Sequence, residues 1–292
     1  MATIKRCQPL LGTYVEITLR DERHSEDFLH DLAQMAYKHI TRVQSLMSFH
    51  DPSSELSRLN ACGHLHPLPV NPWTREVITE AERLGRESEG VFDITMAPTL
   101  VQWGFLPKPS TPNADEAGTF RDIVLHRDGR VGFRRPLLLD LGGIAKGYAV
   151  DKAADLLIEY GVQEAVINAG GDLRFVGPKP STLSVRDPSL PRSLHLLSNI
   201  TSPAVATSAA YFANRRHHWR KVSHILHPIT LKPMRSNVSV SVFAQTCVQA
   251  DALTKIVLLD EPQAWQSLLI REKASAAFIT AKGEVVHFPA AA

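Results

Sequence analysis

The segment from residue 217 to residue 228, HHWRKVSHILHP, contains four histidines: His217, His218, His224 and His227. Imidazole is a good ligand for transition metals, and its unperturbed pKa of about 6.5 also suits it to accept a proton near neutral pH. No Cys or Glu is placed to complete a metal shell. The histidines therefore have two alternative interpretations. They could form a metal site, as in a zinc-dependent hydrolase, or they could be isolated histidines that lie on the surface or form hydrogen bonds. The second case is commoner in proteins.

The segment LLLDLGGIAKGYAVD, residues 137–151, could bind phosphate. It predicts a buried strand that ends at Asp140-Leu141, a sharp turn at Gly142-Gly143 and a helix from about residue 145. The free N–H groups and the positive dipole end of that helix would face the turn, and Lys146 adds a charge. An ordinary strand-to-helix turn is the alternative, because no standard nucleotide fingerprint is present.

Two further segments have a chemical and a structural interpretation. In NAGGDLRF, Gly170-Gly171 predicts either a tight hairpin turn or a second backbone-lined wall of the same site. In QADALTKIVLLD, Asp251 and Lys255 lie one helical turn apart. They predict either an exposed ion pair or a carboxylate near a helix start that coordinates Mg²⁺.

Hydrophobic periodicity indicates the elements that would position these residues. We expect a strand over 9–20, strands over 123–126 and 130–133, β-rich segments over 182–208 and 236–244, and a final strand pair. Helices are expected over 25–47, 72–89, 145–160 and 247–259, with an exposed loop over 106–118. Strands in adjacent pairs favour an α+β fold with antiparallel sheets over a doubly wound fold.

Composition excludes several classes of protein. The chain has 292 residues, 44% of them apolar, and a net charge of +2 that is spread along the sequence without a basic tract. We therefore expect one or two domains, and neither nucleic acid nor an anionic membrane surface as a partner. Cys7, Cys62 and Cys247 are far apart, which predicts free thiols in a reduced compartment. With no signal peptide or membrane span visible, we expect a cytoplasmic protein, or an exported one if an N-terminal segment has been removed.

Taken in order, several segments resemble the FAD:protein FMN transferase (ApbE) family. They are LLGTYVEITL, MSFHDPSSELSRLN, FDITMAPTLVQWGF, LDLGGIAKGYAVD, NAGGDLR, ATSAAY, HILHP and ADALT. The resemblance covers roughly residues 9–260. Each motif alone is weak, but their shared order makes the resemblance specific.

The resemblance implies a T-fold-like α+β architecture in which residues 1–292 form one unit, with FAD in a cleft between two intertwined lobes. Active members cleave the FAD pyrophosphate, transfer FMN to a Ser or Thr hydroxyl of a target protein, and release AMP with help from Mg²⁺. The implied partners are thus FAD and an acceptor flavoprotein. The protein's part in such phosphoryl-type chemistry is to position groups and neutralise charge.

The resemblance also assigns roles to residues. The FAD contacts fall on Leu11, His50, Trp103, Gly104, Phe105, Asp140, Lys146 and Ile225. The base that would accept the hydroxyl proton falls on His224. The magnesium ligands fall on the carbonyl of Gly143, on Asp251, and on the positions Thr254 and Lys255.

This sequence departs from the family pattern at several of these places. Leu11 replaces a Met and His50 replaces a Tyr. His-x-x-Asp-Pro has become His224-Ile-Leu-His227-Pro, Thr-Ser-Gly-Asp has become Thr207-Ser208-Ala209-Ala210, and Lys255 replaces a Thr.

Two carboxylates are thus absent and one ammonium is added. We expect a remodelled electrostatic site that includes His227, with the Asp251–Lys255 pair at the metal position and weak or no Mg²⁺ binding. An FMN transferase and an FAD-binding module with little or no transfer activity are the two resulting hypotheses.

Overall fold

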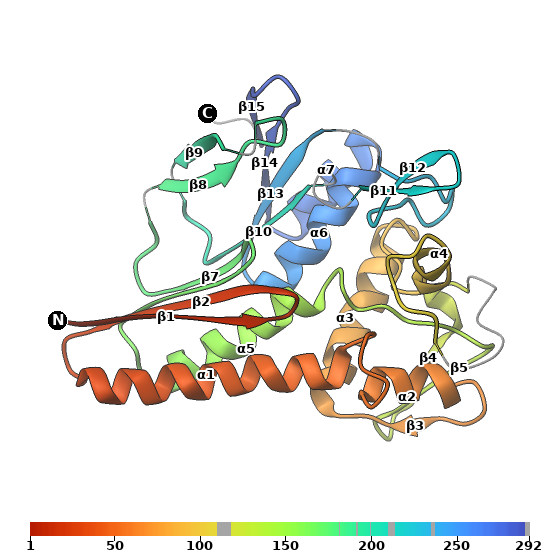
Figure 1. The fold of residues 1–292 in the computed structure, drawn as a ribbon, viewed down its shortest axis with the longest axis horizontal. Coiled ribbons are helices and arrows are strands. Elements are labelled where there is room, and N and C mark those ends of the chain that lie inside the picture. Colours follow the sequence, from red (N-terminus) through yellow and green to blue (C-terminus); the bar gives the residue numbers. More distant parts are fainter. Residues whose placement is uncertain are drawn as a thin grey trace.

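An eight-stranded antiparallel sheet forms the centre of the molecule (Figure 1). The computed structural model describes residues 1–109, 118–180, 182–190, 192–198, 200–209, 214–234 and 237–289. The strand order is β1-β2-β6-β7-β10-β13-β14-β15. The strands are β1 (Ala2–Leu10), β2 (Thr13–Asp21), β6 (Glu164–Ala169), β7 (Asp172–Val176), β10 (Ala204–Ala209), β13 (Ser239–Ala244), β14 (Ser275–Ile279) and β15 (Val285–Phe288). The predicted α+β class with antiparallel pairing is confirmed.

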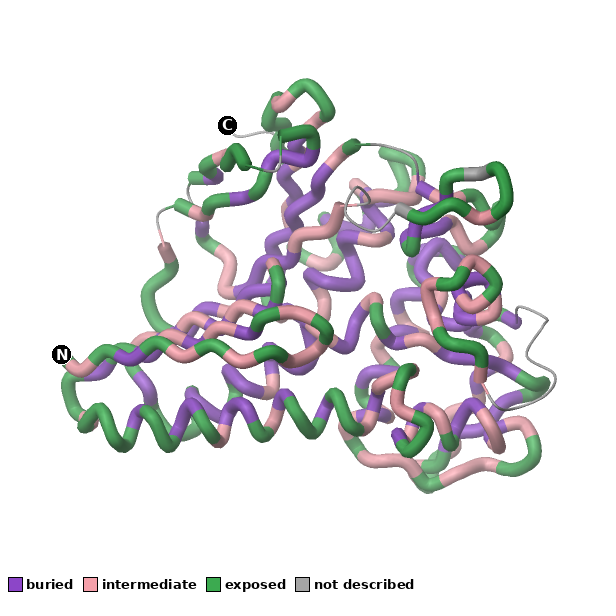
Figure 2. Tube along the Cα trace, in the orientation of Figure 1, coloured by how far each residue is buried: buried purple, intermediate pink, exposed green. Residues whose placement is uncertain are grey.

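Helices cover one face of this sheet. They are α1 (Glu26–Met47), α5 (Ala145–Glu159), α6 (Cys247–Leu259) and α7 (Pro262–Arg271). Leu29, Leu32, Ile40 and Val43 lie on the buried stripe of α1, at the spacing that predicted this helix. Figure 2 shows the buried residues concentrated where helices and sheet meet. On the opposite face, the hairpin β8 (Thr182–Arg186) and β9 (Leu194–Ser198) contributes to a smaller apolar cluster with β7 and β10.

A second group of elements lies beside the end of α1 (Figure 1). It contains α2 (Glu55–Cys62), α3 (Pro72–Glu87), α4 (Ala97–Gln102), a 3₁₀ turn (Phe120–Asp122), and the small sheet of β3 (Leu68–Pro69), β5 (Arg130–Phe133) and β4 (Ile123–Leu125). A hairpin of β11 (Asn214–His217) and β12 (Arg220–Ser223) stands near α4. No described helix has both the length and the apolar composition that a bilayer crossing requires.

The predicted strand over 9–20 is wrong, because the chain reverses within it. Leu11 and Gly12 adopt left-handed backbone angles, with φ of 55° and 71°, and they join β1 to β2 as a hairpin. Alternating side chains look alike in one long strand and in two paired strands, so only the turn distinguishes them. The helices α2, α4 and α7 were not expected, and residues 110–117 of the predicted loop lie outside the described part of the chain.

The predicted strand over 137–141 has its four leucines buried, but it belongs to no sheet. Its hydrogen bonds come from other partners. The Asn60 side-chain amide donates to the Leu139 carbonyl (3.0 Å) and accepts from the Leu139 N–H (2.8 Å), while Asp140 N–H donates to the Ile94 carbonyl (2.8 Å). Asn60 thus replaces a neighbouring strand and fixes the approach to the Gly142-Gly143 turn.

Replacing Asn60 with Ala should lower the free energy of unfolding by about 2–4 kcal/mol, because two buried backbone groups lose their only side-chain partner. Denaturant unfolding of the variant measures this loss. Asn237→Ala, at an exposed position, is the matched control and should be nearly neutral. Equal stability of the two variants would contradict the bracing role of Asn60.

Candidate functional site

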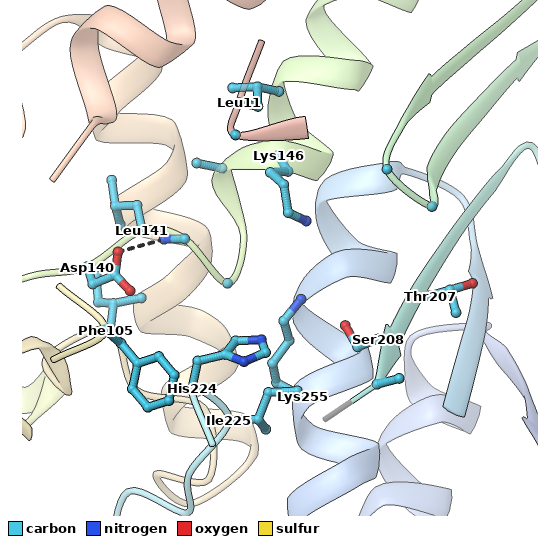
Figure 3. A pocket seen from close by; sticks show the side chains of 18 of the residues that line it. Leu11, Phe105, Asp140, Leu141, Lys146, Thr207, Ser208, His224, Ile225 and Lys255 are labelled. Atoms are coloured by element: carbon cyan, nitrogen blue, oxygen red, sulfur yellow. Dashed lines mark hydrogen bonds between the residues drawn. The ribbon is translucent and has the colours of Figure 1, made fainter. Parts of the chain in front are cut away.

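A cavity of about 1320 Å³ opens between the central sheet and the second group of elements (Figure 3). It is bordered by the β1–β2 turn, the end of α1, the segment before α5, the β6–β7 turn, β8, β10 and the segment after β12. Its lining includes these residues assigned from the sequence: Leu11, His50, Phe105, Asp140, Gly143, Lys146, His224, Ile225 and Lys255. Segments more than two hundred residues apart thus meet at one site. A cavity larger than those that hold drug-sized ligands can accommodate a dinucleotide.

Four of the assigned residues do not line the cavity. Trp103 packs beside it against an apolar cluster that includes Phe105, and the Gly104 carbonyl accepts a hydrogen bond from Arg215. Asp251 and Thr254 are fully buried on α6, behind Lys255. Because they are buried, Asp251 and Thr254 can act on a ligand only through their neighbours or after a local rearrangement.

The turn before α5 exposes backbone to the cavity. Gly142 N–H donates to Asp140 Oδ1 over 3.0 Å, the interaction dashed in Figure 3. Burial raises the pKa of the Asp140 carboxyl, although this hydrogen bond and the charge of His50 act against the shift. Ile144, at the N-cap of α5, has no side-chain oxygen to accept from the first turn. Within the first turn, Gly147 N–H donates to Asp251 Oδ2 over 3.1 Å, so a carboxylate from α6 caps part of the helix start, and the rest of its positive end faces the cavity beside Lys146.

Two ammonium groups and two carboxylates form a compact charge cluster at the floor of the cavity. Lys146 forms an ion pair with Asp172, and its Nζ lies 3.7 Å from Asp251 Oδ2. Lys255 forms an ion pair with Asp251 and donates to the Asp251 carbonyl over 2.9 Å. The Asp251–Lys255 pair predicted from the sequence is thus present. In Figure 3 the amino groups of Lys146 and Lys255 point toward each other.

The cluster shifts the pKa values of its members in different directions. Burial opposes the charge on Lys146, but Asp172 and Asp251 outweigh it and raise the lysine pKa. Burial also opposes ionisation of Asp251, yet Lys146 and Lys255 lower its pKa. For Asp172, burial and repulsion by Asp251 prevail over the two lysines and raise its pKa to about 6. Near neutral pH, Lys146 is therefore charged and Asp251 is ionised.

The Thr254 hydroxyl is engaged within the protein. It donates to the Asp251 carbonyl over 2.6 Å and shares a hydrogen bond of 2.7 Å with Ser208 on β10. Ser208 and Thr207 line the cavity, whereas Ala210 lies outside the described residues.

His224 and His227 occupy different environments although they are three residues apart. His224 is exposed, points into the cavity beside Lys255, and has its ring centroid 6.1 Å from that of Phe105 (Figure 3). His227 does not line the cavity; its Nδ1 accepts from Ile229 N–H over 3.2 Å and supports the turn that follows.

The expectation that His227 belongs to a remodelled site is therefore wrong, because this side chain lies in a turn outside the cavity. The Asp of the family pattern could hold this turn by accepting from backbone N–H groups. His227 accepts in the same way, but without a negative charge. Among the described residues, no three His, Cys, Asp or Glu side chains are grouped as a metal site requires. This gives the histidine metal site no support.

Sequence reasoning missed Asp172 as the partner of Lys146 and Ser208 as the partner of Thr254. Asp172 stands directly after the Gly170-Gly171 turn, which reverses the chain between β6 and β7 and lines the cavity. A carboxylate after such a turn was the available signal. Both predicted interpretations of this turn hold together, because it is a hairpin turn and also a wall of the cavity.

Comparison with known sequences gives a consistent family. The model of the ApbE family matches residues 11–279. A Vibrio cholerae protein named FAD:protein FMN transferase is 32% identical over 238 residues, which cover 76% of this chain and 71% of that protein. A Salmonella typhimurium protein of the same name is 28% identical, over 82% of this chain and 74% of its own length.

Solved structures give the same fold. The ApbE protein from Thermotoga maritima superimposes with a TM-score of 0.82 at 24% identity, covering 97% of this chain and 96% of its own. The flavin transferase ApbE from Vibrio cholerae superimposes with a TM-score of 0.81 at 25% identity, covering 98% and 96% of the two chains.

Proposed function

The chain belongs to the ApbE family, and on that basis we propose that it is an FAD:protein FMN transferase. It would move FMN from FAD to a Ser or Thr hydroxyl of a target flavoprotein and release AMP. The observation that carries this proposal is the shape and lining of the cavity. One space large enough for a dinucleotide has the start of a helix and two lysines on its floor, and an exposed histidine on its wall.

The reaction assigns a role to each of these groups. The acceptor hydroxyl oxygen attacks the phosphorus of the FMN half of FAD, and its proton passes to His224. The bond between that phosphorus and the bridging oxygen breaks, and AMP leaves with the bridging oxygen. Lys146, the Gly143 N–H and the dipole of α5 would stabilise the charge on the phosphate oxygens.

Magnesium, which the family resemblance implies, does not fit the residues present. The ammonium of Lys255 has no lone pair to offer a metal. The Asp251 carboxylate already accepts from Lys255 and from Gly147 N–H, the latter over 3.1 Å, and it lies 3.7 Å from the Lys146 ammonium. The Thr254 hydroxyl is directed at the Asp251 carbonyl. We therefore derive no step through a metal ion.

Purified protein incubated with FAD and a Thr-containing acceptor peptide tests the proposal. Mass spectrometry should show the peptide with FMN attached, and chromatography should show one AMP for each FMN transferred. If FAD binds tightly but neither AMP nor modified peptide forms with any acceptor, the second hypothesis holds and the chain is an FAD-binding module.

FAD should bind more tightly than FMN by about tenfold or more, because only FAD brings a pyrophosphate and an adenine to the cavity; one charge-assisted contact contributes about 1.5–3 kcal/mol. Isothermal titration calorimetry measures both affinities, with riboflavin as the phosphate-free control. Equal affinities for FAD and FMN would show that the floor of the cavity does not bind the pyrophosphate.

A further inference from the structure

We propose that the ammonium of Lys255 takes the place of a catalytic magnesium ion, so that this chain cleaves FAD without a divalent metal. The proposal rests on the proposed function, and it identifies Lys255 as the cation that assists the cleavage of FAD. The amino group would stand beside the FAD pyrophosphate and neutralise charge as AMP leaves.

The position of Lys255 supports this role. Its side chain is 17% exposed, lines the cavity and runs along the Gly143 turn, where a methyl group added to Gly143 would lie 3.7 Å from Lys255 Cε. Asp251 holds the ammonium from behind through its carboxylate and its carbonyl. A lysine that is anchored in this way and faces the ligand space is already oriented, so little side-chain entropy is lost when it contacts a phosphate.

The charge of the whole site is consistent with this substitution. Relative to the family pattern, the sequence lacks carboxylates at His227 and Ala210, and the cation at position 255 has one charge instead of two. On the cavity floor, Lys146 and Lys255 balance Asp172 and Asp251. A divalent cation added beside the fixed ammonium would be repelled by several kcal/mol at about 4 Å and an effective dielectric near 20.

Metal dependence of the wild type and of Lys255→Thr tests the proposal. Wild-type FAD affinity, AMP release and melting temperature should be the same in EDTA and in magnesium chloride. Lys255→Thr restores a hydroxyl and removes the ammonium. It should release AMP roughly tenfold to a hundredfold more slowly in EDTA, the loss of one charge-assisted contact, and it should gain both activity and melting temperature when magnesium is added.

Two further variants separate charge from packing. Lys255→Met keeps the length of the side chain without its charge, and should be slow in EDTA and in magnesium alike. Lys38→Thr, at an exposed position of α1, should behave as wild type. Wild-type AMP release that requires magnesium, or a magnesium-induced rise in the wild-type melting temperature, would overturn the proposal. If no variant transfers FMN under any condition, the proposed function fails, while FAD affinity and the thermal shift still decide the role of Lys255.

A second inference comes from the distribution of charge. The positive charge is not evenly spread, as composition suggested: between Asp187 and Asp251 the chain has no Asp or Glu, but it has seven Lys and Arg residues. This stretch includes β10, the β11–β12 hairpin and His224. A stretch of chain with only positive charges, part of which borders the cavity through β10 and His224, favours anionic partners.

The β11–β12 hairpin has two features that its own stability does not require. Arg216 on β11 lies directly opposite Lys221 on β12, and like charges in opposite positions destabilise a strand pair. At the tip of the hairpin, Trp219 is 94% exposed. An exposed Trp beside basic side chains is typical of a binding surface.

We infer that this hairpin binds an acidic segment of the acceptor protein and guides its hydroxyl to His224. The hairpin is continuous with the site: His224 directly follows β12, and the Arg215 guanidinium lies 5.1 Å from the ring centroid of Phe105, which lines the cavity. Arg216 and Lys221 do not line the cavity, so they do not contact a ligand held within it.

Binding of two matched peptides to the FAD-loaded protein tests this inference. Each has a central Thr, flanked by Asp in one peptide and by Asn in the other, and fluorescence anisotropy measures affinity without requiring transfer. The wild type should prefer the Asp peptide by about tenfold, less at high salt, and Arg216→Gln/Lys221→Gln should lose the preference with unchanged FAD affinity. An equal loss of FAD affinity would show that Arg216 and Lys221 serve FAD binding. A variant that loses binding only to phosphatidylserine vesicles would show that these two residues bind a membrane surface. Either result overturns the inference.

Discussion

His224→Ala is expected to lower FMN transfer by about 10²–10⁴ while leaving FAD affinity nearly unchanged. His224 is exposed on the cavity wall and stands beside Lys255 (Figure 3), and the proposed reaction assigns to it the proton of the acceptor hydroxyl. Removing the proton acceptor should slow the chemical step without removing the contacts that hold FAD. Single-turnover transfer, followed by the mass of the acceptor, and calorimetry with FAD measure the two quantities separately.

His227→Ala is the control variant for this prediction. It removes an imidazole three residues away that supports a turn and does not line the cavity. We expect a lower melting temperature and little change in the rate per folded molecule. If His224→Ala instead lowered the melting temperature and kept normal specific activity, its role would be structural, and another group would have to accept the proton.

Lys146→Ala is expected to lower the free energy of unfolding by about 3–5 kcal/mol, because it leaves Asp172 and Asp251 buried with one fewer cation. The side chains of these two carboxylates are 2% and 0% exposed, so in the intact protein the lysines rather than water compensate their charge. The same variant should weaken FAD binding by about 1–3 kcal/mol if the ammonium contacts a phosphate. Denaturant unfolding and FAD titration measure the two effects.

The stability loss in Lys146→Ala should depend on pH in a defined direction. Asp172 already has a pKa raised to about 6 from its ordinary value of 3.8, and loss of the lysine raises it further. The folded protein then binds a proton that the unfolded chain has released, so stability falls as the pH rises through this range. The deficit should therefore be smallest near pH 4 and largest above pH 7.

Two additional variants check the cause. Lys146→Ala/Asp172→Asn should recover much of the lost stability, because it removes the unpaired carboxylate together with the lysine. Lys38→Ala, at an exposed position of α1, should be nearly neutral. A Lys146→Ala protein with wild-type stability at neutral pH would show that the cluster does not depend on this ion pair.

The sequence by itself determined the elements whose signals are local, and it determined the family. The apolar stripe of α1 and the Gly142-Gly143 turn before α5 depend on residues close together in the chain, and both are present. The order of short motifs identified the family, because their order along the chain requires no knowledge of which segments meet. It also showed a Lys at position 255 where the family has a Thr, and this led to the Asp251–Lys255 pair.

The tertiary structure alone decided what the isolated segments do. The sequence predicts a strand over 137–141, but the Asn60 side chain from α2, rather than a neighbouring strand, bonds the backbone of Leu139. The sequence also places His227 in the site, but this side chain supports a turn. Asp172 follows a glycine turn in the sequence, and only the meeting of β7, α5 and α6 makes it the partner of Lys146. The physical reason is range: periodicity and turn residues act within a few positions, whereas charge pairing and burial depend on contacts between residues far apart in the chain.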